Sequence, residues 1–407
     1  MGLGTFNANG FFHSSFNATN LNQKSFSNMI MRLFPEGSSP LYALTGEVNR
    51  KIAKSVTHGY WTKHMAYTSL TVNGAIIDSV TTLVVDSTAG LLPNMTFQVP
   101  TTREVIRINT VTNATTLEID RSFGRVAAAT IPDNAVCKLI GNATPESQNR
   151  PTARSIATVW VPNYTVLIRN AWAVGGTTAA ELAEAGFDNI QENKMDCMEL
   201  HSTEIEGQLL WGQAVAPATD ATTGDKIHAT QGLVDAVYEF AADNVDTANA
   251  TTTYAELVAL TEGPFQYSTS KTGGGNKMRT VFCDSQAMKV FHEIGDTYGQ
   301  ITLTQKETSF GMQYTSFNTY KGRMNLVEHP LLTESAPAAG IAILVDLPTV
   351  GIAYLKGRDV KREEYDGSKD GSNSGIDATG GSLLSEFATE FMSPQTCGVI
   401  NGLTAAA

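Results

Sequence analysis

The sequence contains only four cysteines in 407 residues, and they are widely spaced: Cys137, Cys197, Cys283 and Cys397. Zinc-binding domains and small disulfide-stabilised domains both need cysteines at close, repeated spacings. The sequence therefore indicates neither class, and we expect the four thiols to be ordinary small buried side chains.

Long hydrophobic runs and excess positive charge are also missing. No stretch approaches the ~18 apolar residues of a membrane-spanning helix. The first residues, MGLGTFNANGFF, lack the basic start of a signal peptide, and Phe6 stands where a myristoylation signal needs Ser or Thr. Lys and Arg number 28 against 40 Asp and Glu, a net charge of −12. From the missing apolar runs and lipidation signals we expect no membrane association. Because phosphate binding needs a basic surface, we also expect only local, non-specific contact with DNA.

The composition is nevertheless that of a folded protein. Hydrophobic residues make up 42% of the chain and charged residues 17%, which is sufficient for a buried core. Single cores stop growing at ~250 to 300 residues, so we expect two or three substructures.

Residues 1–64 are rich in Asn, Ser, Phe and Gly and show no sustained period of 2 or 3.6 residues. This pattern predicts an extended N-terminal arm. Six basic residues stand against two acidic ones, Glu36 and Glu47, which gives the arm a local charge of +4. The basic residues are Lys24, Arg32, Arg50, Lys51, Lys54 and Lys63. We expect the arm to lie on something acidic, and to act between copies of the chain.

From about residue 74 to 143 the pattern changes to short runs rich in β-branched residues, such as TTLVVD, EVIRINTV and AVCKLI, separated by turns with Gly, Pro and Asn. These runs predict a small all-β module. A second extended stretch, SIATVWVPNYTVLIRNAWAV, follows the link TPESQNRP. We interpret the module as an insertion that folds independently.

A long helix is predicted from near Phe187 to about Trp211. At 3.6 residues per turn, one stripe of the helix is apolar. It comprises Phe187, Ile190, Met198, Ile205 and Leu209, with Cys197 and His201. The opposite side is acidic and comprises Asp188, Glu192, Asp196, Glu199 and Glu206.

The rest of the chain, residues 216–407, predicts a mixture of helices and strands. GLVDAVYEFAADN and TYAELVALTEGPF have helical spacing, and KMRTVFCD is a strand pattern that leads into the helix pattern SQAMKVFHEIGDTYG. Two strands are expected around Lys321 and Gly322, and further strands at GIAILVD, GIAYLKGRDV and LLSEFATEF.

Patterns that suggest a chemical site have simpler explanations. Cys197 and His201 lie four apart but on the apolar stripe, with no third or fourth metal ligand. The loop Asp366–Asp377 places oxygen side chains at EF-hand spacings, but its last position is Asp instead of Glu, and no helices flank it. Gly273–Lys277 lacks the phosphate-loop spacing, and the triplet Asn163–Thr165 matches a glycosylation signal by chance. We therefore predict no catalytic residue, no cofactor and no metal.

The order of these parts resembles the major capsid proteins of tailed bacteriophages, which have the α+β Johnson fold. WVPNYTVLIRNAWAVGGTTA, followed by LHSTEIEGQLLWGQ, is similar to the end of an E-loop running into the spine helix in one branch of the family. DSTAGLLPNMTFQV and EVIRINTV are similar to the β insertion that this branch carries in its E-loop, and LLSEFATEFMSPQTCGVINGL resembles its C-terminal strands. The polar loop Asp366–Gly381 is longer than this pattern expects.

The resemblance implies an N-arm at 1–64, an E-loop at 65–180 with its β module at about 74–143, a spine helix at 181–215, and the remaining peripheral and axial domains at 216–407. It also implies a non-enzymatic subunit that self-assembles into hexamers and pentamers, forming an icosahedral head around double-stranded DNA. Expected partners are copies of itself and scaffold, decoration and portal proteins. The expected location is the virion capsid, assembled in the bacterial host cytoplasm.

Two other interpretations belong to different classes. One is a phage tail or surface adhesin that uses the β module for recognition, although adhesins usually repeat such domains. The other is a hydrolase that uses the helix carboxylates, which have no partner base or nucleophile.

Candidate residues for contacts between subunits follow from the acidic helix. Asp188, Glu192 and Asp196 repeat at i, i+4 and i+8, an arrangement that costs ~0.2 to 0.5 kcal/mol per pair unless cations neutralise it. We expect cations from an adjacent copy to lie along this face, unless it is simply a solvated surface. The candidates are Arg50, Lys51 and Lys54 in the arm and Arg150 and Arg154 after the module.

Overall fold

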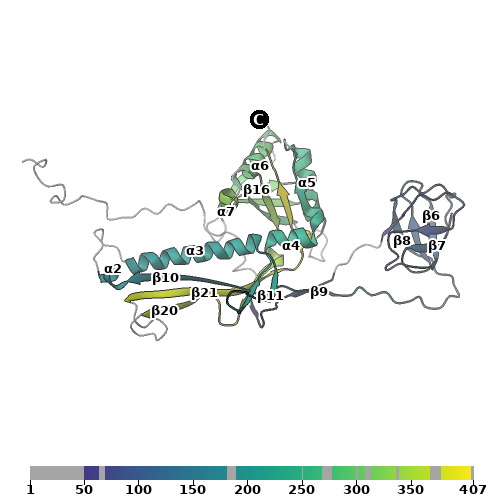
Figure 1. Ribbon diagram of the computed structural model, residues 1–407. Coiled ribbons are helices and arrows are strands. Elements are labelled where there is room, and N and C mark those ends of the chain that lie inside the picture. The colour runs from purple at the N-terminus through teal and green to yellow at the C-terminus, as the bar shows by residue number, and fades with distance from the viewer. Residues whose placement is uncertain are drawn as a thin grey trace, which may run out of the picture. The chain divides into compact units, whose positions relative to one another are not determined.

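The computed structural model describes residues 50–63, 69–180, 189–249, 251–267, 277–298, 301–307, 313–335, 339–366 and 377–404. The chain forms two compact units. One is Trp61–Trp160, and the other combines Met1–Tyr60 with Val161–Ala407. Helices and sheets are both present in the larger unit, so the predicted α+β class is confirmed (Figure 1).

The smaller unit is a β-barrel. Its sheet has the order β3-β8-β5-β6-β7-β4. The strands are β3 (Ser69–Thr71), β4 (Thr82–Val84), β5 (Met95–Gln98), β6 (Val105–Val111), β7 (Thr116–Asp120) and β8 (Val136–Asn142). A bridge between Val72 and Val85 joins the two ends of this order, with Asn73 N–H donating to Val84 O at 2.9 Å. The sheet therefore closes on itself.

Alternation along the strands fills the interior of the barrel. In β6, Ile106 and Ile108 are fully buried, whereas Arg107 and Asn109 between and after them point outward. Phe97 of β5 is also fully buried in this core. The predicted module at 74–143 is thus present, although its first strand begins at Ser69.

The larger unit contains a five-stranded sheet with the order β1-β19-β21-β10, in which β20 also pairs with β21. The strands are β1 (Arg50–Ala53), β10 (Val166–Gly175), β19 (Val350–Leu355), β20 (Lys361–Asp366) and β21 (Ala378–Phe391). Strand β21 pairs with β10 along one edge, and with β19 and then β20 along the other. Helix α3 (Asn189–Trp211) lies alongside β10 and β21, and short α2 (Gly176–Ala180) precedes it (Figure 1).

A second, seven-stranded sheet has the order β13-β22-β18-β14-β17-β16-β15. Its strands are β13 (Val245–Thr247), β14 (Met278–Cys283), β15 (Ile301–Glu307), β16 (Gln313–Asn318), β17 (Arg323–Glu328), β18 (Ala342–Val345) and β22 (Gly398–Asn401). Its helices are α4 (Leu233–Phe240), α5 (Tyr254–Gln266), α6 (Ser285–Tyr298) and α7 (Pro330–Ser335). The predicted strand-to-helix unit at 277–299 is confirmed by β14 and α6. The predicted strand pair around Lys321 is confirmed by β16 and β17.

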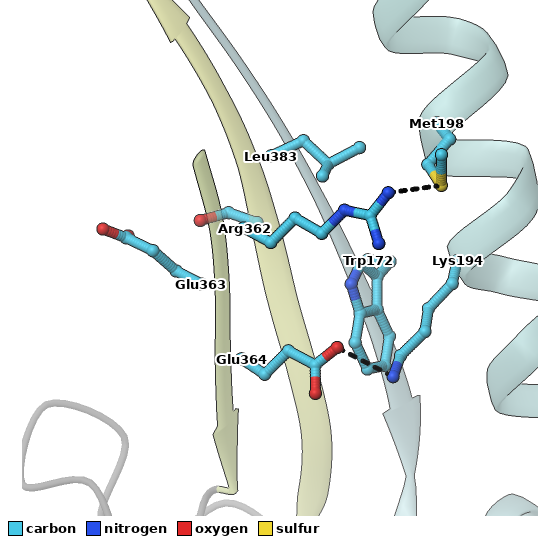
Figure 2. Close-up of a pocket in the computed structure, with 8 residues that line it drawn as sticks. Trp172, Lys194, Met198, Arg362, Glu363, Glu364 and Leu383 are labelled. Carbon is cyan, nitrogen blue, oxygen red and sulfur yellow. Dashed lines mark hydrogen bonds and ion pairs between the residues drawn. The ribbon is translucent and has the colours of Figure 1, made fainter. Parts of the chain in front are cut away.

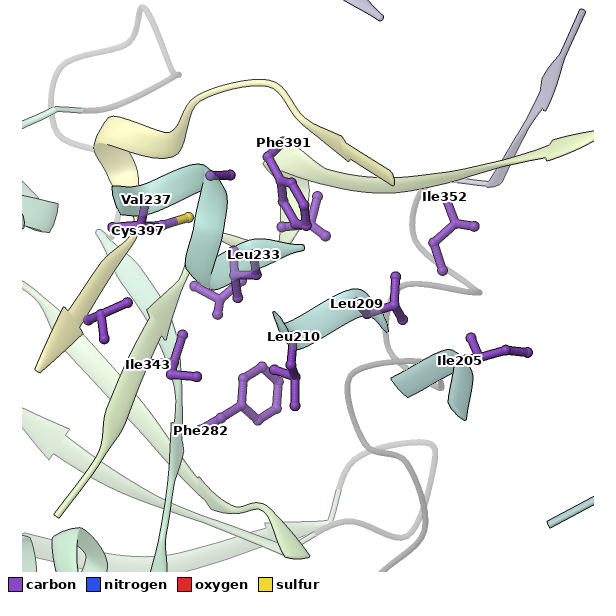
Figure 3. Packing of buried hydrophobic residues seen from close by; sticks show 14 of the residues in the cluster. Ile205, Leu209, Leu210, Leu233, Val237, Phe282, Ile343, Ile352, Phe391 and Cys397 are labelled. Carbon is purple, nitrogen blue, oxygen red and sulfur yellow. The ribbon is translucent and has the colours of Figure 1, made fainter. Parts of the chain in front are cut away.

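The described residues also form two short ribbons, β2 (Tyr60–Thr62) with β9 (Val159–Val161) and β11 (Val215–Thr219) with β12 (Lys226–Ala229). One apolar cluster connects the two sheets of the larger unit (Figure 3). It combines Leu209 of α3 and Ile352 of the five-stranded sheet with Phe282 and Ile343 of the seven-stranded sheet. The C-terminal end of α3 is therefore anchored in the core that both sheets share.

The predicted stripe on α3 needs two corrections. Cys197, His201, Ile205 and Leu209 are buried as expected, but Met198 is 43% exposed and Glu206, predicted on the polar side, is fully buried. Positions 205 and 206 are both buried, as are 209 and 210, so this end of the helix is covered on two sides. Phe187 and Asp188 lie outside the described residues, as do 367–376 of the candidate calcium loop and 268–276 of the Gly-rich segment.

Candidate subunit interface

Helix α3 is held on the five-stranded sheet by a buried histidine. The imidazole of His201 contacts Ser385 Oγ through Nε2 at 2.8 Å and Asn170 Oδ1 through Nδ1 at 2.5 Å. Burial lowers the pKa of His201, and the charge of Glu204 opposes this effect only in part. The lowered pKa keeps the ring neutral near pH 7. Both ring nitrogens are therefore used to join α3 to β10 and β21, not to hold a metal with Cys197.

A second buried pair fixes the C-terminal end of α3. Glu206 Oε1 lies 2.8 Å from His329 Nε2, and both side chains are fully buried. His329 follows β17, so this contact joins α3 to the seven-stranded sheet. The sequence pattern does not predict this contact, because an acid beside an apolar stripe normally faces solvent.

The opposite face of α3 carries exposed side chains of two kinds. Asp196 and Glu199 are exposed and Glu192 is partly exposed, while Asp188 lies outside the described residues. Large apolar side chains stand among these acids, with Met195 51% and Leu200 61% exposed. A mixed acidic and apolar surface is suited to contact with a protein that offers both apolar and basic groups.

Cations of the same chain lie at the flank of α3, in a small pocket between the helix and β20 (Figure 2). Lys194 Nζ lies 2.9 Å from Glu364 Oε1 and 4.9 Å from the centre of the Trp172 ring. Arg362 reaches from β20 to α3, where Nη2 lies 3.8 Å from Met198 Sδ. The cavity of about 40 Å³ has room for only a few water molecules. The pocket therefore positions Lys194 and Arg362 and is too small for a sizeable ligand.

The predicted basic residues of the arm are placed in or beside the five-stranded sheet. Arg50 forms an ion pair with Asp359 and lies 4.9 Å from the centre of the Tyr354 ring. Lys51 pairs with Glu390 at 2.6 Å. Lys54 is exposed, and within the described part of the chain it has no ion pair.

The two arginines after the module belong to the smaller unit. Arg154 Nη1 donates to Gly90 O at 3.0 Å, so this side chain has a partner in the barrel. Arg150 is exposed. Among the five basic candidates, Lys54 and Arg150 are thus the two exposed side chains that have neither an ion pair nor a side-chain hydrogen bond in the described residues. In the sequence, nothing distinguished them from the other three.

A family model and a curated relative both match nearly the whole chain. The family model described as "SU10 major capsid protein" matches residues 11–404. The major capsid protein of Pseudomonas phage PaMx41 is 41% identical over 406 residues, covering 97% of this chain and 96% of that protein.

Solved structures give more distant likenesses. The cyanophage A-1(L) capsid asymmetric unit is 13% identical, with a TM-score of 0.49, over 96% of this chain and 100% of that one. The structure of Mycobacterium phage Cain is 10% identical, with a TM-score of 0.48, over 98% and 99% of the two chains.

Proposed function

The chain belongs to the SU10 major capsid protein family, and from this premise we propose that its copies assemble as hexamers and pentamers into an icosahedral head around double-stranded DNA. It is a structural protein of a phage capsid, not an enzyme, and its place is the virion capsid. The family match over residues 11–404 carries this assignment and decides against an adhesin or a hydrolase.

Different parts of the subunit have different proposed roles. We infer that α3 acts as the spine helix, because it is the longest described helix and is anchored in the core shared by both sheets. The barrel corresponds to the module inserted in the E-loop, since it forms a compact unit of its own. The arm was predicted at residues 1–64, but its residues Arg50–Ala53 form β1 in the sheet of their own chain, so we propose that the part before Arg50 acts between copies.

Contact between copies is proposed at the acidic face of α3. Asp188, Glu192 and Asp196 meet basic side chains of an adjacent copy there. Lys54 and Arg150 are the preferred partners, because Arg50, Lys51 and Arg154 already have partners in their own chain. Each exposed ion pair contributes at most ~1 kcal/mol and is screened by salt, but a closed shell repeats the pair in every copy.

Further partners are proposed from the family. Assembly takes place in the host cytoplasm with scaffold, portal and decoration proteins. DNA is enclosed with only local contacts, because the net charge of −12 disfavours a broad phosphate-binding surface. No described helix is long and apolar enough to cross a membrane.

The test is to express the full chain alone and to examine it by electron microscopy and sedimentation velocity. Closed shells, or free hexamers and pentamers, are the expected products. Fibres, or a monomer that stays monomeric at high concentration with and without its scaffold protein, would contradict the proposal.

A further inference from the structure

The chain leaves the larger unit for the barrel and returns to it through two short segments, which we call the root and define as residues 50–60 and 161–165. The segments bind each other through backbone hydrogen bonds. His58 N–H donates to Asn163 O at 2.8 Å, Asn163 N–H donates to His58 O at 3.1 Å, and Thr165 N–H donates to Val56 O at 2.9 Å. The root is therefore a paired element within the larger unit.

A buried carboxylate attaches the outgoing segment of the root to β21. Lys51 Nζ donates to Glu390 Oε2 at 2.6 Å, and His58 Nε2 lies 2.7 Å from Glu390 Oε1. The Glu390 side chain is only 5% exposed. Both carboxylate oxygens are thus used by residues on either side of Lys54.

A second buried carboxylate attaches the returning segment. Glu386 lies four residues before Glu390 on β21, and therefore on the same face of the sheet. Thr165 Oγ1 donates to Glu386 Oε1 at 3.1 Å, and Arg358 Nε lies 2.8 Å from Glu386 Oε2. The Glu386 side chain is 6% exposed.

A neutral contact supports the same attachment. Asn163 is 2% exposed, and its Nδ2 donates to Thr389 O at 2.9 Å. Its Oδ1 accepts from Gln231 N–H at 3.0 Å. The Asn163–Thr165 triplet thus has a buried structural role, which the sequence did not reveal. Because these contacts involve no ionisable group, they do not change with pH.

Two carboxylates in the middle of a buried strand are not explained by packing. Burial of an ionised carboxylate costs several kcal/mol unless it is paired, and apolar residues of similar volume would fill the same space at no such cost. What the carboxylates add is dependence on their charge. We propose that Glu386 and Glu390 form a latch that holds the root on β21 at neutral pH, and that protonation of Glu390 in acid releases the outgoing segment.

The direction of the pH effect follows from the surroundings of Glu390. Burial alone would raise the pKa of Glu390. The hydrogen bonds and charges of His58 and Lys51 together lower this pKa by more, so the folded pKa lies below the ordinary 4.5. A lowered folded pKa means that the stabilisation is present above the unfolded value and is lost as pH falls through the folded value. The latch is therefore closed at neutral pH and opens in acid.

The other ionisable groups around Glu390 do not reverse this direction. Burial raises the pKa of Tyr60, with smaller contributions from Glu239, Cys397 and Glu390 itself, so the phenol stays neutral. Burial likewise raises the pKa of Cys397. Glu386 and Arg358 form the adjacent pair on the same face. Protonation of Glu390 removes the negative charge that both Lys51 and His58 contact.

The experiment measures amide hydrogen exchange in the full-length, unassembled subunit. Wild type and Glu390→Gln are compared at pH 7 and in steps below pH 4.5, using protection factors that correct for intrinsic rates. The expected result is a loss of protection of about tenfold or more at 54–58 and 163–165 in E390Q at pH 7, because charge-assisted hydrogen bonds are lost. Strand β1, whose backbone pairs with β19, should lose less. Wild type should show the same loss in acid, with β14 unchanged in both. Glu199→Gln, an exposed acid on α3, is the matched control and should have no effect.

Trypsin provides a second readout at neutral pH. Lys54 lies between the two latched residues, so cleavage after it requires release of the root, and E390Q should be cleaved about tenfold faster or more. If E390Q fails to fold, His58→Gln keeps one donor and should give a smaller increase. Equal rates in wild type and the variant that folds would overturn the proposal. The proposal would also be overturned if lowering the pH reduced protection in the variant by as much as it does in wild type. Neither readout depends on shell formation, so the latch and the proposed function can fail separately.

Discussion

The barrel and the five-stranded sheet each bury a glutamate paired with a basic residue, but the partners differ in their separation along the chain. In the barrel, Arg121 and Glu104 are 17 residues apart, whereas Lys51 and Glu390 are 339 residues apart. Closing a long loop costs more entropy and delays the contact in folding. The barrel can therefore complete its polar network locally, but the sheet cannot do so until the whole chain is present.

The pair in the barrel is also more completely satisfied. Arg121 Nε and Nη2 meet the two oxygens of Glu104 at 2.8 and 2.9 Å, and Ser122 N–H and Ala129 N–H donate to the same carboxylate. Arg121 Nη1 donates to Ile77 O at 2.7 Å. A buried ion pair whose remaining hydrogen bonds are all made fixes several loops at once.

The largest effect is expected when the two compact units are expressed as separate chains. Residues 61–160 expressed alone should fold, with dispersed amide signals and a cooperative thermal transition. Residues 161–407 alone should lack a formed five-stranded sheet at its β1 side, because β1 and Lys51 are missing. An undispersed spectrum from 61–160 would contradict the comparison.

Glu104→Ala should destabilise the barrel by ~3 to 5 kcal/mol, since it leaves the Arg121 guanidinium buried without its partner. Denaturant unfolding of the isolated module measures this. The control is Glu104→Leu with Arg121→Met, which should recover most of the loss.

The same pair gives the barrel an acid dependence. Burial raises the pKa of Glu104, but the hydrogen bonds from Arg121, Ser122 and Ala129 lower it below its ordinary value. Wild-type stability should therefore fall as pH drops below about 4.5, and this fall should be smaller in the Leu/Met double variant. Parallel acid profiles of the two proteins would count against the assignment.

Truncation of the arm should have an intermediate effect that depends on where the cut lies. Removal of residues 1–49 should leave subunit stability nearly unchanged and prevent shell formation. Removal of 1–60 also deletes β1, Lys51 and His58, and should cost ~2 to 4 kcal/mol through the lost charge-assisted hydrogen bonds. Chemical unfolding of the two truncated subunits distinguishes these outcomes. Equal stability of both would show that β1 and the latch contribute nothing.

The smallest effect on the subunit is expected at the exposed face of α3. Reversal of Asp188, Glu192 and Asp196 to Lys should change subunit stability by no more than ~0.5 kcal/mol and impair assembly. Added reversal of Lys54 and Arg150 to Glu should partly restore shells, with a salt dependence that light scattering can follow. Normal assembly of the triple variant would leave these acids as a solvated surface.

Local patterns were sufficient to predict many of the elements. The alternation and turn residues of about 74–143, the helical spacing up to Trp211 and the strand pair around Lys321 each depend on neighbours in sequence, and the structure has strands or a helix in each place. Closure of the barrel by Val72 and Val85 was not predicted, because it joins the two ends of the strand order.

The polar network of the larger unit could not be predicted for the same reason. Glu206 has the periodicity of a surface acid and is buried only because His329, 123 residues later, meets it. Glu386 and Glu390 stand in LLSEFATEF, a strand pattern in which acids normally face solvent. Their partners come from the root and from Arg358, which no local pattern connects with them.

Closure of the barrel also limits how copies can polymerise. An open sheet leaves a row of unpaired N–H and C=O groups, at which a strand from another molecule can add without specificity. Where β3 and β4 meet, the described strands of the barrel do not leave such a row, because the bridge between Val72 and Val85 closes the sheet. A crowded pool of newly made subunits can therefore carry one barrel per molecule without gaining a route to amyloid-like stacking through that join.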